Sequence, residues 1–160
     1  MEKNYTLERP SWDELEELIE RYGEPFIIFW GYDMKDIEYV DDYPPCKGEA
    51  VLEIIDEDKV VGVRHRGGNE FVLPMGRVWE SEGFMEGAVR EAKEETGFDV
   101  ELLEFKEIRK LEFTFSNAIL ERWHLLFTAQ VIGGEGVPLD KYEIEEVKLM
   151  DDVPWATEYY

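Results

Sequence analysis

The segment from Gly76 to Phe98 constrains the fold of this chain more than any other, because its glutamates fit one face of a helix. It contains six glutamates, and Glu91, Glu94 and Glu95 fall within one five-residue window. An α-helix turns about 100° per residue, so positions i, i+3 and i+4 are neighbours on its surface. The three carboxylates therefore share one face of a predicted helix.

The same segment predicts where this helix begins, ends and packs. Ala88 and Ala92 fall on a different face, and their small side chains allow close packing on a sheet. Gly97 follows the last position of the pattern, and glycine is the usual residue just beyond a helix C-terminus. We therefore predict a helix from about Phe84 to Thr96.

Strand patterns surround the predicted helix and define the fold class. A short amphipathic helix is expected at residues 11–22, where Ser11 and Glu14 form a capping-box pattern. Strands before and after a central helix, with hairpins among them, predict an α/β fold with a sheet of mixed direction. The expected strands span residues 25–33, 49–55, 60–65, 69–74, 100–115, 121–134 and 143–150.

Length, charge and cysteine content restrict the functional classes. A chain of 160 residues suits one domain, and its net charge of −22 disfavours general binding to nucleic acid or to an anionic membrane. No apolar run approaches the roughly 20 residues that span a bilayer. The single cysteine, Cys46, forms no internal disulfide, and the first residues lack the pattern of a signal peptide. We therefore expect a cytoplasmic protein.

The acidic face has two interpretations, because carboxylates at helical spacing repel one another by a few tenths of a kcal/mol per pair. One is a solvated helix surface in a chain that is acidic throughout. The other is a site for a hard divalent cation, since Mg²⁺ prefers oxygen ligands and usually binds through a few carboxylates together with substrate phosphates. A cation that bridges phosphate oxygens activates a water, and a glutamate then takes its proton.

The fixed spacing of the segment favours the second interpretation. Gly76 is followed after five residues by Glu82 and after seven more by the run Arg90-Glu91-Ala92-Lys93-Glu94-Glu95-Thr96-Gly97-Phe98. This arrangement resembles the complete signature box of the Nudix hydrolases, G-x5-E-x7-R-E-U-x-E-E-x-G-U, in which U is apolar. The resemblance implies a Nudix-type α/β/α sandwich with a mixed β-sheet at residues 48–160, with a C-terminal helix starting after the last strand. Residues 1–47 would be an N-terminal extension of one helix plus a strand.

The resemblance assigns roles by position in the box. Glu91 and Glu95 would be the principal Mg²⁺ ligands, with Mn²⁺ as the alternative metal. Glu94 would share the metal or activate water. Arg90 would hold the glutamates in place through charge-assisted hydrogen bonds, and Glu82 would be a structural or secondary acid. The predicted catalytic residues are thus Glu82, Arg90, Glu94 and Glu95.

Three further positions in this region concern the backbone. Gly76 and Gly97 are expected to serve backbone geometry. The usual Leu-Pro-Gly-Gly turn of the family reads Leu-Pro-Met-Gly here, so Met75 replaces a glycine whose carbonyl often binds metal. A carbonyl survives this replacement, and Met75 therefore stays a candidate metal ligand.

The implied reaction is hydrolysis of the pyrophosphate bond of a small nucleoside diphosphate derivative, such as a nucleotide sugar, an ADP-ribose-like compound or a nucleoside triphosphate. No subgroup marker downstream of the box identifies the substrate. Arg64 and Arg66 are candidates to contact its phosphates, with a solvated hairpin end as the alternative. A further acid from a late loop is expected, and the sequence does not choose among Asp140, Glu143 and Glu145.

Other functions stay open beside the enzyme. A catalytically silent Nudix domain would bind a nucleotide and regulate a partner, and an acidic interaction module would use its glutamates only for solvation. The box retains every glutamate, which favours the enzyme. The N-terminal segment is expected to pack on its own domain, with a homodimer interface or a lid as alternatives.

Overall fold

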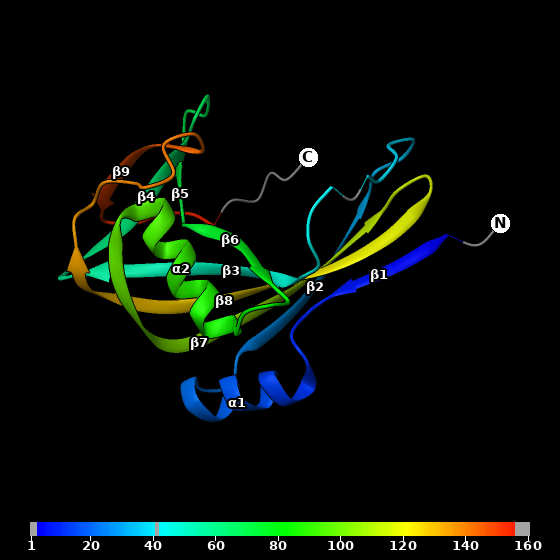
Figure 1. Ribbon diagram of the computed structural model, residues 1–160, viewed down its shortest axis with the longest axis horizontal. Helices are drawn as coiled ribbons and strands as arrows, with labels where there is room; N and C mark the ends of the chain where they lie inside the picture. The colour runs from blue at the N-terminus through cyan, green and yellow to red at the C-terminus, as the bar shows by residue number, and fades with distance from the viewer. Residues whose placement is uncertain (1–2, 41, 156–160) are drawn as a thin grey trace.

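The computed structural model describes residues 3–40 and 42–155, and within these ranges the chain forms one nine-stranded mixed sheet and two helices (Figure 1). The elements are β1 (Asn4–Glu8), α1 (Trp12–Tyr22), β2 (Phe26–Asp33), β3 (Cys46–Asp56), β4 (Lys59–His65), β5 (Phe71–Val72), β6 (Met75–Trp79), α2 (Phe84–Thr96), β7 (Phe98–Thr114), β8 (Ala118–Gly134) and β9 (Ile144–Met150).

A long antiparallel hairpin of β7 and β8 forms the centre of the sheet, whose main order is β2-β7-β8-β3-β4-β5. β8 has two parallel neighbours on its other edge: its first part pairs with β1, and its later part pairs with β3, where Glu49 lies opposite His124. β2 runs parallel to the second half of β7. β6 and β9 add antiparallel pairs to β3 and β4. The N-terminal strands thus extend the same sheet that carries α2.

Both helices pack on one face of this sheet. Leu15 and Leu18 of α1 share one buried cluster with Ala88 and Ala92 of α2 and with Phe127 of β8. Successive residues of a strand point to opposite faces, so alternate residues of β3, β7 and β8 supply most of the rest of this core. Both alanines are fully buried, which confirms the predicted packing face of α2.

An extended segment covers the opposite face. Val51, Leu73 and Leu126 form a second buried cluster there with Val153 and Trp155. The C-terminal helix expected after the last strand does not begin in residues 151–155, and residues 156–160 lie outside the described chain. Tertiary contacts hold this segment extended instead: the carbonyl of residue 154 accepts the N–H of Leu73 at 3.0 Å, and Val153 and Trp155 pack on the sheet.

A buried polar cluster fastens β1 to the sheet. Arg122 of β8 donates from Nε to Glu8 Oε1 at 2.5 Å, and Cys46 Sγ donates to Glu8 Oε2 at 2.9 Å. Burial, together with the hydrogen bond to Glu8, raises the pKa of Cys46 to about 12. Since the thiolate is the reactive form, Cys46 is a structural thiol here.

The main sequence predictions for the fold are confirmed. α2 has the expected bounds with Gly97 beyond its end, and Ser11 caps α1 by accepting the N–H of Glu14 at 3.2 Å. The α/β class with a mixed sheet is also confirmed, although the two described helices share one face. None of the described helices is both long and apolar enough to cross a bilayer. The division of the chain at residue 47 stays a prediction.

Candidate active site

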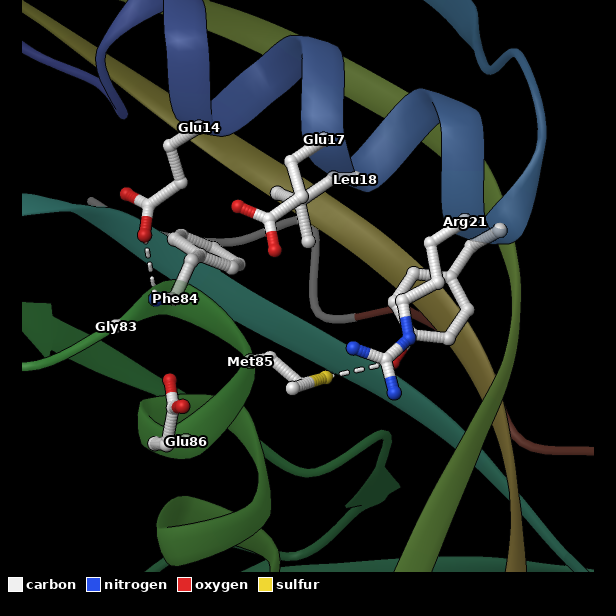
Figure 2. Close-up of a pocket in the computed structure, with 9 residues that line it drawn as sticks. Glu14, Glu17, Leu18, Arg21, Gly83, Phe84, Met85 and Glu86 are labelled. Atoms are coloured by element: carbon white, nitrogen blue, oxygen red, sulfur yellow. Dashed lines mark hydrogen bonds between the residues drawn. The ribbon is translucent and has the colours of Figure 1, made fainter.

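The N-terminus of α2 is capped from α1. Gly83 occupies the N-cap position and offers no side-chain acceptor, so the first N–H groups of the helix need another partner. Glu14 of α1 supplies it, accepting the Phe84 N–H at 3.0 Å, as Figure 2 shows. Lys47 holds the same carboxylate through an ion pair of 2.9 Å. A negative carboxylate near the N-terminus also interacts favourably with the positive end of the helix dipole. Glu14 of α1 therefore helps to fix the residue at which α2 begins.

A pocket lies between α1 and the start of α2, and Glu14, Arg21 and Met85 are among its lining residues (Figure 2). The Tyr22 hydroxyl donates to Met85 Sδ across it. The four signature glutamates, Glu82, Glu91, Glu94 and Glu95, do not line this pocket. The catalytic site predicted from the signature box therefore lies toward the C-terminal end of α2.

The C-terminus of α2 is joined to a late loop. Gly97 has a φ of 78°, in the left-handed region where glycine is favoured, and a Cβ there would lie 2.1 Å from the Val137 carbonyl oxygen. The N–H groups of Leu139 and Asp140 both donate to the Glu94 carbonyl at 2.9 Å. Because Gly97 has no side chain, the loop can pack directly on the C-terminal end of α2. This agrees with the backbone role predicted for Gly97.

Arg90 contacts three of the four signature glutamates that it was predicted to hold, and Glu95 is not among them. Its guanidinium donates to both oxygens of Glu82, at 2.6 and 3.0 Å. It also donates from one Nη to Glu91 Oε1 at 3.0 Å and to Glu94 Oε2 at 3.1 Å. The hydrogen bond from Arg90 is the largest cause of the lowered pKa of Glu82. Glu82 also accepts the Trp79 N–H at 3.1 Å, so it braces the loop against α2.

The Glu91 carboxylate lies directly over the backbone of Gly76. A Cβ at Gly76 would be 2.1 Å from the Glu91 carboxyl carbon, so the glycine leaves the space that this carboxylate occupies. Burial raises the pKa of Glu91 to about 7, and the charges of Glu94 and Glu143 add to the rise against the opposing effect of Arg90. Glu91 is thus a carboxylate shielded from water, and the positive charge of Arg90 does not fully offset the effect of burial on its pKa.

Glu95 is the most buried carboxylate of the box, with 1% of its surface exposed. Its Oε1 accepts the Met75 N–H at 3.1 Å, while its Oε2 is buried without a hydrogen-bond partner among the described residues. Burial raises the pKa of Glu95 well above its usual value, and the negative charges of Glu143 and Glu91 raise it further. A buried acceptor without a donor is rare in folded proteins and calls for a bound group or proton.

The late loop brings one of the three candidate acids to this cluster. Glu143 is close enough for its charge to raise the pKa values of both Glu91 and Glu95. Asp140 instead shapes the turn, since its Oδ1 accepts the N–H of Glu143 at 3.1 Å. Glu145 is paired with an arginine on β4. The sequence left these three equivalent, and their placement favours Glu143 as the additional acid.

The two candidate phosphate-binding arginines already have partners. Arg64 of β4 forms ion pairs of 3.2 Å with Glu145 and with Glu146 of β9. Arg66 donates from Nε and from Nη to the Lys141 carbonyl. Both residues border the loop that carries Glu143, and contact with substrate phosphates stays a prediction for both.

A buried contact between a glutamate and a histidine beside the carboxylates was missed by sequence reasoning. Glu49 Oε2 of β3 lies 2.7 Å from His124 Nε2 of β8, and His124 is 1% exposed. Burial alone would raise the pKa of Glu49, but the charges of His124, Arg122 and Arg77 outweigh it and lower the pKa to about 2. Glu49 in turn raises the pKa values of Glu95 and Glu143. The sequence shows a polar residue in each of two apolar strands, which is the signal that could have drawn attention to them. Only the register of β3 against β8 shows that the two residues lie opposite each other.

The carboxylate cluster fits a hard divalent cation in its chemistry. Its donors are oxygens, and two of them belong to shielded carboxylates with raised pKa values. In residues 3–40 and 42–155, no three acidic, histidine or cysteine side chains are arranged so that they could hold a metal ion together. Arg90 accounts for this arrangement, because it draws Glu91 and Glu94 toward its guanidinium. Mg²⁺ usually keeps several waters and takes further ligands from substrate phosphates, so it needs few protein carboxylates.

Comparison with known proteins gives one family-model match. The family model described as the NUDIX domain matches residues 47–155. A search of curated proteins gave no significant match.

Similar solved structures share the fold at low sequence identity. An ADP-ribose pyrophosphatase from Streptococcus suis is 21% identical, with a TM-score of 0.50 over 68% of this chain and 78% of that one. A UDP-X diphosphatase is 17% identical, with a TM-score of 0.52 over 93% of this chain and 64% of that one. A MutT NUDIX hydrolase from Burkholderia pseudomallei is 18% identical, with a TM-score of 0.52 over 69% of this chain and 88% of that one.

Proposed function

The chain belongs to the Nudix hydrolase family, and from that premise we propose that it is a Mg²⁺-dependent hydrolase of the pyrophosphate bond in a small nucleoside diphosphate derivative. The candidate substrates are a nucleotide sugar, an ADP-ribose-like compound and a nucleoside triphosphate. The similar structures carry the names of an ADP-ribose pyrophosphatase and a UDP-X diphosphatase, so their names support the class without selecting one member. The cytoplasmic location stays a prediction from the sequence.

One observation supports the proposal most directly: Glu95 is buried beside Glu91 and Glu143 with one carboxylate oxygen lacking a partner among the described residues. An ionised carboxylate held away from water without a partner is strongly destabilised. A solvated acidic helix would instead expose its carboxylates. Burial of this group is therefore understandable if the folded protein gains a cation there.

Each residue of the carboxylate cluster would have its own role in hydrolysis. Bound Mg²⁺ would neutralise phosphate oxygens and lower the pKa of a coordinated water. Glu91 and Glu95 would hold the metal, with the Met75 carbonyl as a further ligand. Arg90 would keep Glu91 in position through the hydrogen bond described above. Glu143 would take a proton from the attacking water, because a carboxylate with a raised pKa is the better base near neutral pH.

The direct test is a product assay over a panel of ADP-ribose, nucleotide sugars, NADH, dinucleoside polyphosphates and nucleoside triphosphates with Mg²⁺. Wild type, Glu95→Gln and Glu86→Gln would be compared, since Glu86 is an exposed glutamate on the same helix. Glutamine keeps an oxygen to accept the Met75 N–H but loses the charge. We expect wild type and Glu86→Gln to hydrolyse the same compound, and Glu95→Gln to be inactive with an unchanged fold.

The alternative, a silent domain that binds a nucleotide and regulates a partner, makes a different prediction. It would hydrolyse none of the panel, while Mg²⁺ together with one compound would still raise the melting temperature. Normal turnover by Glu95→Gln would show that the role proposed for Glu95 is wrong. Absence of both hydrolysis and Mg²⁺-dependent stabilisation would favour an acidic module without a nucleotide site.

A further inference from the structure

Strand β2 forms one edge of the sheet, and its apolar side chains are exposed. It carries none of the residues of the carboxylate cluster. One edge of β2 pairs with β7, and within the described ranges 3–40 and 42–155 its other edge pairs with no strand. Five consecutive side chains from Phe26 to Trp30 are 40% to 81% exposed. Proteins usually protect such an edge with charged residues, proline, a bulge or a covering segment, because its unpaired backbone groups invite another strand.

The surroundings of β2 are nearly neutral in a strongly acidic chain. The run Phe26–Tyr32 contains no charged residue, although the whole chain carries a net charge of −22. The part of β7 that pairs with this run contains Glu107 and Glu112, which are balanced by Arg109 and Lys110. Two copies of the protein could therefore meet at β2 without bringing their excess negative charges into direct contact.

The exposed area is close to what a stable interface needs. The exposed fractions from Phe26 to Trp30 correspond to about 600 Å² if a residue of this size exposes about 200 Å². A standard protein interface buries about 800 Å² on each partner. Successive side chains of β2 point to opposite faces of the sheet, so edge pairing would bury only part of this area, and packing of flanking segments against the second copy would supply the remainder. We propose that β2 pairs with β2 of a second copy of this chain, so that the two sheets join into one continuous sheet across a twofold axis.

The sequence of β2 is complementary to itself in this arrangement. Strands related by a twofold axis pair in antiparallel fashion, and the centre of the uncharged run is Phe29. With the axis at Phe29, Ile28 lies opposite Trp30 of the second copy, and Ile27 lies opposite Gly31. The small glycine thus faces a branched side chain, and Asp33 falls beyond the paired run, where it does not face its own copy.

The oligomeric state in solution tests this interface. Sedimentation equilibrium and light scattering across the micromolar range would be applied to wild type, Phe29→Lys and Ile132→Lys. Ile132 is the matched control, because it is 62% exposed and lies near the far end of β8. We expect a dimer for wild type and for Ile132→Lys, and a dissociation constant at least about 30-fold higher for Phe29→Lys, as for loss of an interface hot spot. Higher salt should tighten the dimer, since it screens repulsion between the acidic subunits.

Disulfide trapping gives a second, independent readout of the axis. Directly opposed residues of an antiparallel pair have Cβ atoms about 5 Å apart, so Phe29→Cys should form an intermolecular disulfide on oxidation, whereas Ile132→Cys should not. The native Cys46 is buried and should not react. A monomeric wild type, a dimer that survives Phe29→Lys, open-ended aggregates in place of dimers, or trapping at residue 132 and not at 29 would each overturn the proposal. Circular dichroism and melting curves would verify that the variants are folded.

Discussion

Replacing Gly76 with alanine should remove activity while leaving the fold nearly intact. The backbone of Gly76 is not in the left-handed region, so alanine can adopt its conformation without strain. The new Cβ, however, would lie 2.1 Å from the carboxyl carbon of Glu91 and 2.7 Å or less from both of its oxygens. Non-bonded carbon atoms prefer a separation of about 3.5 Å, so the Glu91 carboxylate must move by at least about 1 Å.

This displacement sets the expected magnitude. A misplacement of about 1 Å in a catalytic arrangement can cost on the order of 100-fold in rate, or about 2.7 kcal/mol in the activation free energy. The displaced group is the end of a flexible side chain, so the free energy of unfolding should fall by less than about 1 kcal/mol and the melting temperature by less than about 4 °C. We therefore expect kcat/KM to fall about 100-fold, together with weaker activation by Mg²⁺.

The assay would measure kcat/KM as a function of Mg²⁺ concentration, with a melting curve for each variant. Gly31→Ala is the matched control, because within one copy of the chain no atom lies within 4 Å of its added Cβ, and its φ is also outside the left-handed region. Full activity in Gly76→Ala would refute the argument that Glu91 must occupy this space to act. A large loss of stability would instead show that the contact is structural.

Three further predictions concern the loop acid, the helix cap and the titration of the site. Glu143→Gln should lower kcat by about 100-fold, whereas Glu145→Gln, two residues further along in β9, should change it little. Glu14→Gln should lower the free energy of unfolding by about 1 kcal/mol through loss of the charged cap, and Glu16→Gln, exposed on the same helix, should not. The pKa of Glu91 is raised from 4.5 to about 7 in the folded state, so the folded apo-protein keeps a proton that the unfolded chain has lost in that window. Its stability should therefore fall by about 3 kcal/mol as the pH rises through the window, and Mg²⁺ should stabilise the protein more above about pH 7 than below about pH 5, in melting curves recorded with and without the metal.

The acidic helix could be predicted from the sequence because its determinants are local. Helical spacing places Glu91 and Glu95 on one face, and Gly97 ends the helix through its own backbone conformation. These features depend on residues within a few positions of one another. The bounds of α2 and its packing face are therefore readable without knowledge of the rest of the chain.

The remaining parts of the site depend on contacts between residues far apart in the sequence. Glu14 caps α2 from 70 positions away, and Glu49 meets His124 only because β3 and β8 pair in one register. Spacing could not distinguish Glu143 from its neighbours either, since the direction of a loop side chain follows from how the loop is fastened to α2. The sequence alone thus determined the helix, its carboxylates and their family. The burial that raises their pKa values, and the partners that hold them, were decided by tertiary structure, because desolvation and register are properties of the assembled sheet and not of any segment.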